Sequence, residues 1–242
     1  MLLEELASGL YEGALRVDQL LGVVPAEGIL LAMHSLLSPG DHVITMTPGY
    51  TSLRTVAETA IGCEVSEWAA QWSAETGEPG FTVGALRQLI RPGSTKMVVV
   101  NFPHNPTGAL LSPAEWDELV CCCDKHGVWL FSDEMYRHLE RDGVPTLPSA
   151  AESYSKGVSL SGLSKAYGLP GLRVGWLAAQ DTEVLRRAAE LKDYTTICAG
   201  APNECLGLIA LRARKTLWAR CNGIIDENIG ASPGGLKLKR PA

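Results

Sequence analysis

The sequence predicts an α/β fold, a three-layer α/β/α arrangement in which helices cover both faces of a mostly parallel central sheet. Short runs rich in β-branched residues alternate along the chain with longer stretches of helical periodicity. This alternation is typical of strands joined by helical crossovers. The short runs are apolar almost throughout, as are strands buried on both faces. Ligands bind such sheets beyond the carboxyl ends of the strands, so a site is expected at that edge.

Five runs are expected to be buried strands because they combine β-branched and aromatic residues with flanking turn signals. They lie at 42–46 (HVITM), 96–102, 127–134, 156–162 and 172–179. Helices are predicted between them at 26–37, 51–61, 82–90, 113–125 and 182–192, with a longer one at 201–220. The helix at 113–125 has the clearest start, since Ser112 precedes Pro113 and Glu115 completes a capping box.

The chain is predicted to divide into residues 1–20, 21–222 and 223–242. The first segment is predicted to form one weakly amphipathic helix. The middle segment contains no repeat and no low-complexity linker. The last dozen residues, ASPGGLKLKRPA, lack core periodicity, so an irregular tail is expected.

Charge and composition exclude several classes of protein. A net charge of −6 provides no basic field for nucleic acid or an acidic membrane surface. No apolar run approaches the ~20 residues that a membrane span needs. The start of the chain carries acidic residues and no basic region of the kind found in signal peptides, which points to the cytoplasm.

Seven cysteines are present, and Cys121, Cys122 and Cys123 are consecutive. Three adjacent cysteines cannot all face one way on a helix, so a disulfide framework is not expected. His126 lies close by, but no CxxC pair completes a set of metal ligands. The interpretation is free cysteine on a core-facing helix, without a metal site.

Polar side chains cluster where the predicted strands end. Asn105 lies in the proline-bounded turn PHNPTG, and Asp133 ends the run GVWLFSDE, with Tyr136 three residues later. The next strand end and the start of its neighbour add Ser161, Ser164, Lys165 and Arg173.

Each of these residues also has a plain structural interpretation. Asn105 could be a turn residue, Asp133 a helix cap and Lys165 an exposed loop lysine. Arg173 could pair with any nearby acid. Together, however, they suit a cofactor that has a phosphate, a carbonyl and a basic ring nitrogen.

Three segments carry a resemblance to a known family: PHNPTG, FSDEMY and SLSGLSKAYGLPGLRVGW. In this order and at these separations they resemble the class I/II aminotransferases of pyridoxal-phosphate (PLP) fold type I, over residues 20–220. VVVNFPHNPTG with LSKAYGLPGLRVGW also resembles capreomycidine-synthase-like members. The resemblance implies the large domain of that fold, pyridoxal 5'-phosphate as cofactor, amino acid and 2-oxo acid substrates, and a homodimer.

The resemblance assigns a role to each residue of the cluster. Lys165 would hold the cofactor as a Schiff base and shuttle a proton once it is freed. Asp133 would pair with the ring nitrogen. Asn105 and Tyr136 would bind the ring oxygen, and Arg173 would clamp the phosphate.

Further binding residues follow from the same resemblance. Tyr50, in TPGYTSL, would stack on the cofactor ring, although it could instead be a core or surface tyrosine. The phosphate would also meet backbone amides where the first long helix begins. Pro25 has no N–H, which leaves Ala26 and Glu27 as the donors.

One position departs from the family pattern. The serine often found three residues before the lysine is Gly162 here. Ser161 or Ser164 would then contact the phosphate, and Ser161 is ranked first.

The resemblance also implies a small domain that is largely missing, with residues 1–20 as its remnant. No residue can be assigned to bind the substrate carboxylate. Transamination is the leading expectation. The alternatives are elimination, replacement or cyclisation on the same fold, or a catalytically silent PLP-binding fragment.

Overall fold

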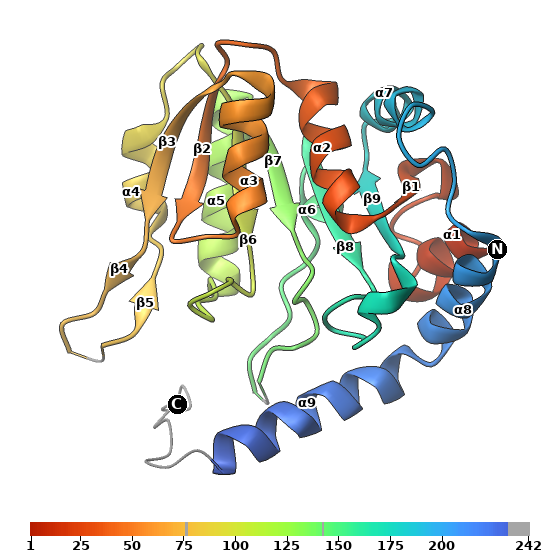
Figure 1. Cartoon of the computed structure of the whole chain (residues 1–242). Coiled ribbons are helices and arrows are strands. Elements are labelled where there is room, and N and C mark those ends of the chain that lie inside the picture. The colour runs from red at the N-terminus through yellow and green to blue at the C-terminus, as the bar shows by residue number, and fades with distance from the viewer. Residues whose placement is uncertain (76, 142, 232–242) are drawn as a thin grey trace.

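A computed structural model describes residues 1–75, 77–141 and 143–231, and it has the predicted three layers (Figure 1). A seven-stranded sheet in the order β1-β9-β8-β7-β6-β2-β3 forms the central layer. In this order, each strand from β8 through β7, β6 and β2 to β3 pairs in parallel with the next. β9 is antiparallel to both β8 and β1. The predicted α/β class with a mostly parallel sheet is therefore confirmed.

The strands are β1 (Leu20–Val23), β2 (His42–Thr47), β3 (Glu64–Ala69), β6 (Thr95–Asn101), β7 (Trp129–Asp133), β8 (Gly157–Gly162) and β9 (Gly175–Ala179). A separate two-stranded ribbon joins β4 (Gln71–Trp72) to β5 (Pro79–Gly80). In β6 the alternating side chains enter two different cores. Val99 packs on one face of the sheet and Val98 on the other, which explains why this strand is apolar without alternation.

The helices are α1 (Leu2–Glu5), α2 (Pro25–Leu36), α3 (Thr51–Thr55), α4 (Val83–Leu89), α5 (Pro113–His126), α6 (Ala150–Ser153), α7 (Thr182–Lys192), α8 (Ala201–Arg212) and α9 (Arg214–Ala231). Helices α2, α3 and α7 cover one face of the sheet, and α4 and α5 cover the other. The predicted start of α5 is present: Ser112 N–H donates to Glu115 Oε2 at 2.8 Å, and Glu115 N–H donates to Ser112 Oγ at 3.3 Å.

The N-terminal segment is not the single helix that was expected. After α1, π-helical turns end at Leu10, and a 3-10 turn at Val17–Gln19 leads into β1. The segment packs into a core with α8 and β9. Tyr11 Oη accepts a hydrogen bond from Trp176 Nε1 at 3.0 Å, and this contact ties it to the sheet.

Three other expectations about elements need correction. The predicted helix at 201–220 is divided at Ala213 into α8 and α9. The strand predicted from 172 begins at Gly175, because 170–172 form a 3-10 turn and Arg173 has a left-handed backbone with φ 53°. The irregular tail expected from residue 223 is helical as far as Ala231, the end of α9, and 232–242 lie outside the described residues.

The cysteines of α5 behave as expected for a core-facing helix, with Cys122 and Cys123 buried and Cys121 exposed. Within the described ranges, no group of three or more His, Cys, Asp or Glu side chains is placed to hold a metal ion. None of the helices in that part of the chain has the length and apolar character needed to span a membrane.

Candidate functional site

The carboxyl ends of β6, β7 and β8 lie side by side and bring the polar cluster to one edge of the sheet. Asn101 ends β6 and is in register with Asp133, which ends β7. Asp133 is in turn in register with Leu160 of β8, two residues before the strand ends at Gly162. The parallel order of these strands therefore gathers residues that are far apart in the sequence.

Asp133 is the most buried ionisable group among the predicted site residues, with 4% of its surface exposed. Its Oδ1 accepts a hydrogen bond from Met135 N–H at 3.1 Å. The pKa of this carboxyl is raised to about 7, mainly by burial; the Met135 hydrogen bond and the charge of Lys165 lower it, and the adjacent Glu134 raises it. No ion pair joins Asp133 to a cation among the described side chains. The site therefore contains a desolvated carboxyl group able to receive a positively charged N–H.

Lys165 lies just beyond β8, in a turn closed by a hydrogen bond from Gly168 N–H to its carbonyl at 2.9 Å. Its side chain is exposed, and Nζ lies 5.8 Å from the centre of the Tyr136 ring. This distance permits a cation–π contact. The structure thus places Lys165, Tyr136 and Asp133 in one neighbourhood, as the sequence predicts.

Helix α2 begins against the same edge. A Cβ atom on Gly162 would lie 2.9 Å from Pro25 Cγ, and one on Gly175 would lie 2.8 Å from it. Both positions need glycine for the helix start to approach this closely. Gly162, the departure from the family pattern, therefore has a packing reason.

Ala26 and Glu27 stand in the first turn of α2. Ala26 is exposed, whereas the Glu27 carboxylate folds back to accept Val24 N–H at 3.1 Å. Its other oxygen accepts Thr196 Oγ1–H at 2.8 Å. The negative side chain of Glu27 is thus engaged with the segment after α7, while its backbone amide remains part of the helix start.

Ser161, Ser164 and Arg173 lie around the β8–β9 connection. Ser161 is half-buried, in register with Trp176. Ser164 Oγ is buried and has no hydrogen-bond partner among the described residues. Arg173 is exposed, and its Nη1 donates to the Pro170 carbonyl at 3.3 Å. Each is near the edge, but within the described residues no hydrogen bond joins Arg173 to either serine.

Asn105 is connected to Asp133 through a residue that the sequence did not single out. Asn105 N–H donates to Asn101 Oδ1 at 2.8 Å, and Asn101 Nδ2 donates to the Asp133 carbonyl at 2.8 Å. The only sequence signal for Asn101 is an amide at the end of the otherwise apolar run VVVNF.

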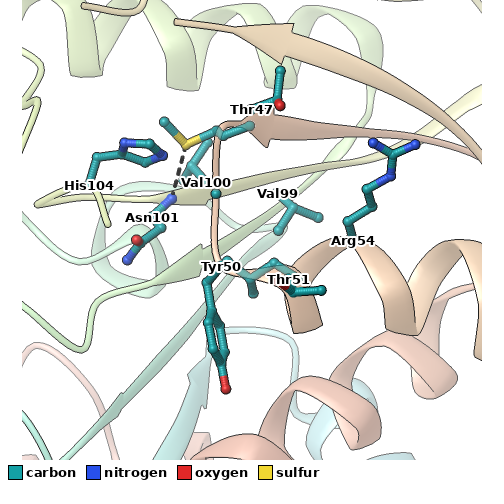
Figure 2. A pocket seen from close by; sticks show the side chains of 11 residues that line it. Thr47, Tyr50, Thr51, Arg54, Val99, Val100, Asn101 and His104 are labelled. Carbon is teal, nitrogen blue, oxygen red and sulfur yellow. Dashed lines mark hydrogen bonds between the residues drawn. The ribbon is translucent and has the colours of Figure 1, made fainter. Parts of the chain in front are cut away.

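A cavity of about 190 Å³ lies beside this edge, between the ends of β2 and β6 and the start of α3 (Figure 2). Its wall includes Tyr50, 43% exposed, and the buried residues Asn101 and His104. Burial lowers the pKa of His104 to about 4, so its imidazole is neutral at pH 7. The side chains of Tyr50 and Arg54 point in different directions (Figure 2). The sequence indicated Tyr50 but not His104.

Comparison with known proteins gives consistent matches. The family model for aminotransferase class I and II matches residues 16–208. Capreomycidine synthase from Streptomyces vinaceus is 34% identical over 188 residues, covering 77% of this chain and 46% of the relative. An arginine–pyruvate transaminase from Pseudomonas aeruginosa is 34% identical over 243 residues, covering 94% of this chain and 58% of the relative.

Among solved structures, a PLP-dependent aminotransferase from Streptococcus suis superposes with a TM-score of 0.83 at 35% identity. The match covers 95% of this chain and 59% of that one. The chain spans about half the length of the curated relatives it matches.

The raised pKa of Asp133 predicts a pH-dependent stability of the cofactor-free protein. A carboxyl group whose pKa is higher in the folded than in the unfolded state stabilises the fold only while it is protonated. Its contribution to the free energy of unfolding therefore falls as the pH rises from about 4 to about 7. At roughly 1.4 kcal/mol per pKa unit, the loss is a few kcal/mol.

Denaturant titrations of the parent and of Asp133→Asn between pH 4.5 and 7.5 measure this loss. The free energy of unfolding of Asp133→Asn should rise relative to that of the parent as the pH rises. Asp117→Asn, which changes an exposed carboxyl on α5, is the control. Its free energy of unfolding should differ from that of the parent by the same amount at every pH. A constant difference for Asp133→Asn as well would contradict the raised pKa.

Proposed function

Since the chain belongs to the family of class I and II aminotransferases, we propose that it forms the cofactor-binding part of a PLP-dependent enzyme. The proposed reaction exchanges an amino group between an amino acid and a 2-oxo acid. The observation that supports this most is the position of Lys165 beside the buried carboxyl of Asp133, at the carboxyl edge of the sheet.

The residues present fit PLP. Asp133 is a buried carboxyl without an ion-pair partner among the described residues, and its raised pKa reflects that environment. A protonated pyridine nitrogen would supply the missing positive N–H. The buried, unpartnered Ser164 Oγ likewise has hydrogen-bonding capacity left for a ligand.

Bound PLP supplies an aldehyde that captures amino groups and a protonated ring that takes up electrons when a bond at the substrate Cα breaks. The Lys165 amine would hold the aldehyde carbon. Once free, the Lys165 amine would move a proton between the substrate Cα and the cofactor. Asp133 would hold the proton on the ring nitrogen throughout.

Other side chains would orient the ring. The Asn105 amide and the Tyr136 hydroxyl would donate hydrogen bonds to the ring oxygen. Tyr50, at the rim of the cavity, would stack on one face of the ring. Its partial exposure is compatible with a ring lying over it.

The phosphate would lie where α2 meets the β8–β9 connection. The backbone amides of Ala26 and Glu27 point along the helix axis at its positive end. Arg173 could add a bidentate contact, because its hydrogen bond to the Pro170 carbonyl is long and leaves most of the guanidinium donors for a ligand. Ser161 or Ser164 would complete the set.

A second candidate function is cyclisation on the same scaffold. The similarity to capreomycidine synthase, equal in identity to that of the transaminase relative, supports it. Both reactions need Lys165 and Asp133 in the same roles, and they differ in the step after the Cα proton is lost. Elimination and replacement belong to the same group of alternatives.

The proposal includes a cytoplasmic homodimer in which residues 21–222 bind PLP and residues 1–20 belong to a small domain. Exposed apolar side chains on and before α8 support association: Tyr194, Ile197, Leu206 and Ile209. Such side chains are commonly covered in assemblies.

Absorbance spectra test the cofactor proposal. The parent protein mixed with PLP should develop a visible band that borohydride removes irreversibly. Lys165→Ala should lose this reducible band. Lys156→Ala, which removes a half-buried lysine just before the opposite end of β8, should keep it. A reducible band of parental intensity in Lys165→Ala would show that another residue holds the cofactor.

A single-turnover experiment separates the two reactions. L-Arginine, suggested by the name of the transaminase relative, is added to a stoichiometric amount of the PLP-loaded protein, and products are identified by mass spectrometry. Transamination predicts one equivalent of 2-oxo acid together with the aminated cofactor. With an arginine derivative that carries a hydroxyl leaving group at Cβ, a cyclic amino acid formed by loss of water with PLP regenerated would instead favour the second candidate, and Lys165→Ala should give neither product.

A further inference from the structure

Asn101 occupies a position that controls two residues of the candidate site at once. It is the last residue of β6 and lies in register with Asp133, the last residue of β7. The residue is 3% exposed, so bulk water does not hydrogen-bond its amide, and the partners must come from the protein. The side chain lines the cavity beside the site (Figure 2).

Both functional ends of this amide are used. Asn101 Nδ2 donates to the Asp133 carbonyl, and Oδ1 accepts Asn105 N–H, each at 2.8 Å. The partners determine the orientation of the amide, because a carbonyl requires the NH₂ end and an N–H requires the oxygen. A third contact, from the Asn101 backbone N–H to Met46 Sδ at 3.2 Å, holds the residue from the β2 side (Figure 2).

We propose that Asn101 is a positioning residue whose single amide group sets the distance and orientation between Asp133 and Asn105. The inference rests on the proposed function, in which Asp133 serves the ring nitrogen and Asn105 the ring oxygen. These two atoms belong to one rigid ring, so their protein partners must keep a fixed separation. A planar amide bonded to both backbones provides that fixed separation.

Few other side chains could do this. Aspartate keeps the acceptor for Asn105 N–H but loses the donor to the Asp133 carbonyl. Leucine has nearly the same size and offers neither group. Glutamine carries the same amide but is one methylene longer, which moves the donor and the acceptor away from their two backbone partners.

The positioning role also predicts a change at Asp133 itself. The Asn101 amide donates to the backbone carbonyl of Asp133, the residue whose carboxyl group is buried. Asn101→Leu removes the bond that fixes this strand end, and Asn101→Asp puts an acceptor or a like charge in its place. Both changes should therefore shift the pKa of Asp133, and Asn101→Asp should raise it. The other charged groups acting on this carboxyl, Glu134 and Lys165, are the same in all variants.

Two measurements test the inference on the whole chain. In cofactor-free protein, the pKa of Asp133 is followed by carboxyl ¹³C NMR, and both variants should shift it by at least about half a unit. With PLP, the dissociation constant should increase roughly tenfold, the expected order for the loss of one or two hydrogen bonds. Asn101→Asp keeps one of the two bonds, so it provides a folded variant if Asn101→Leu does not fold.

Val98→Ala is the matched control, because it truncates a fully buried residue of the same strand that does not line the cavity. It should lower the melting temperature while leaving the pKa of Asp133 and the PLP affinity unchanged. The inference is wrong if both Asn101 variants keep the parental pKa, or if Val98→Ala weakens PLP binding as strongly as they do. If the parent failed to bind PLP while the pKa shifts appeared, the proposed function would fail and the positioning role would stand.

Discussion

The burial of the Asp133 carboxyl group is the constraint on which the candidate site depends. β7 lies in the middle of the sheet with a parallel neighbour on each side, so the end of this strand has little access to water. An ionised carboxylate in that position is costly unless a positive group approaches it. The fold provides one hydrogen bond from Met135 and a more distant charge on Lys165. The site is therefore suited to a ligand that brings its own protonated nitrogen.

The remaining parts of the site follow from how the sheet edge is packed. Glycine at 162 and 175 lets Pro25, and with it the positive end of α2, come within contact distance of β8 and β9. The Asn101 side chain joins β6 to β7 at the last strand pairing. A helix start, a buried acid and a lysine then share one edge, although the helix start lies more than a hundred residues before the acid and the lysine in the sequence.

Local sequence patterns predicted the centre of the fold better than its margins. β6 and β7 are continuous apolar runs, and α5 has a capping box, so both kinds of element could be located from the sequence. β1 was not predicted, because the short run LLGV, just after the expected N-terminal helix, becomes a strand only by pairing with β9. β3 is an edge strand in which Trp68 alone is buried, and its pattern EVSEWA is weak. Motifs located Lys165 and Asp133, whereas Asn101 and His104 became visible only through long-range contacts.

The central claim is that Asp133 keeps the ring nitrogen of bound PLP protonated. ¹⁵N NMR of PLP labelled at that nitrogen and bound to the protein measures this directly. The parent should give the chemical shift of a protonated ring at neutral pH, and Asp133→Asn, which retains a similar shape without the charge, should give that of a neutral ring. A protonated ring in both proteins, or a neutral ring in both, would contradict the claim.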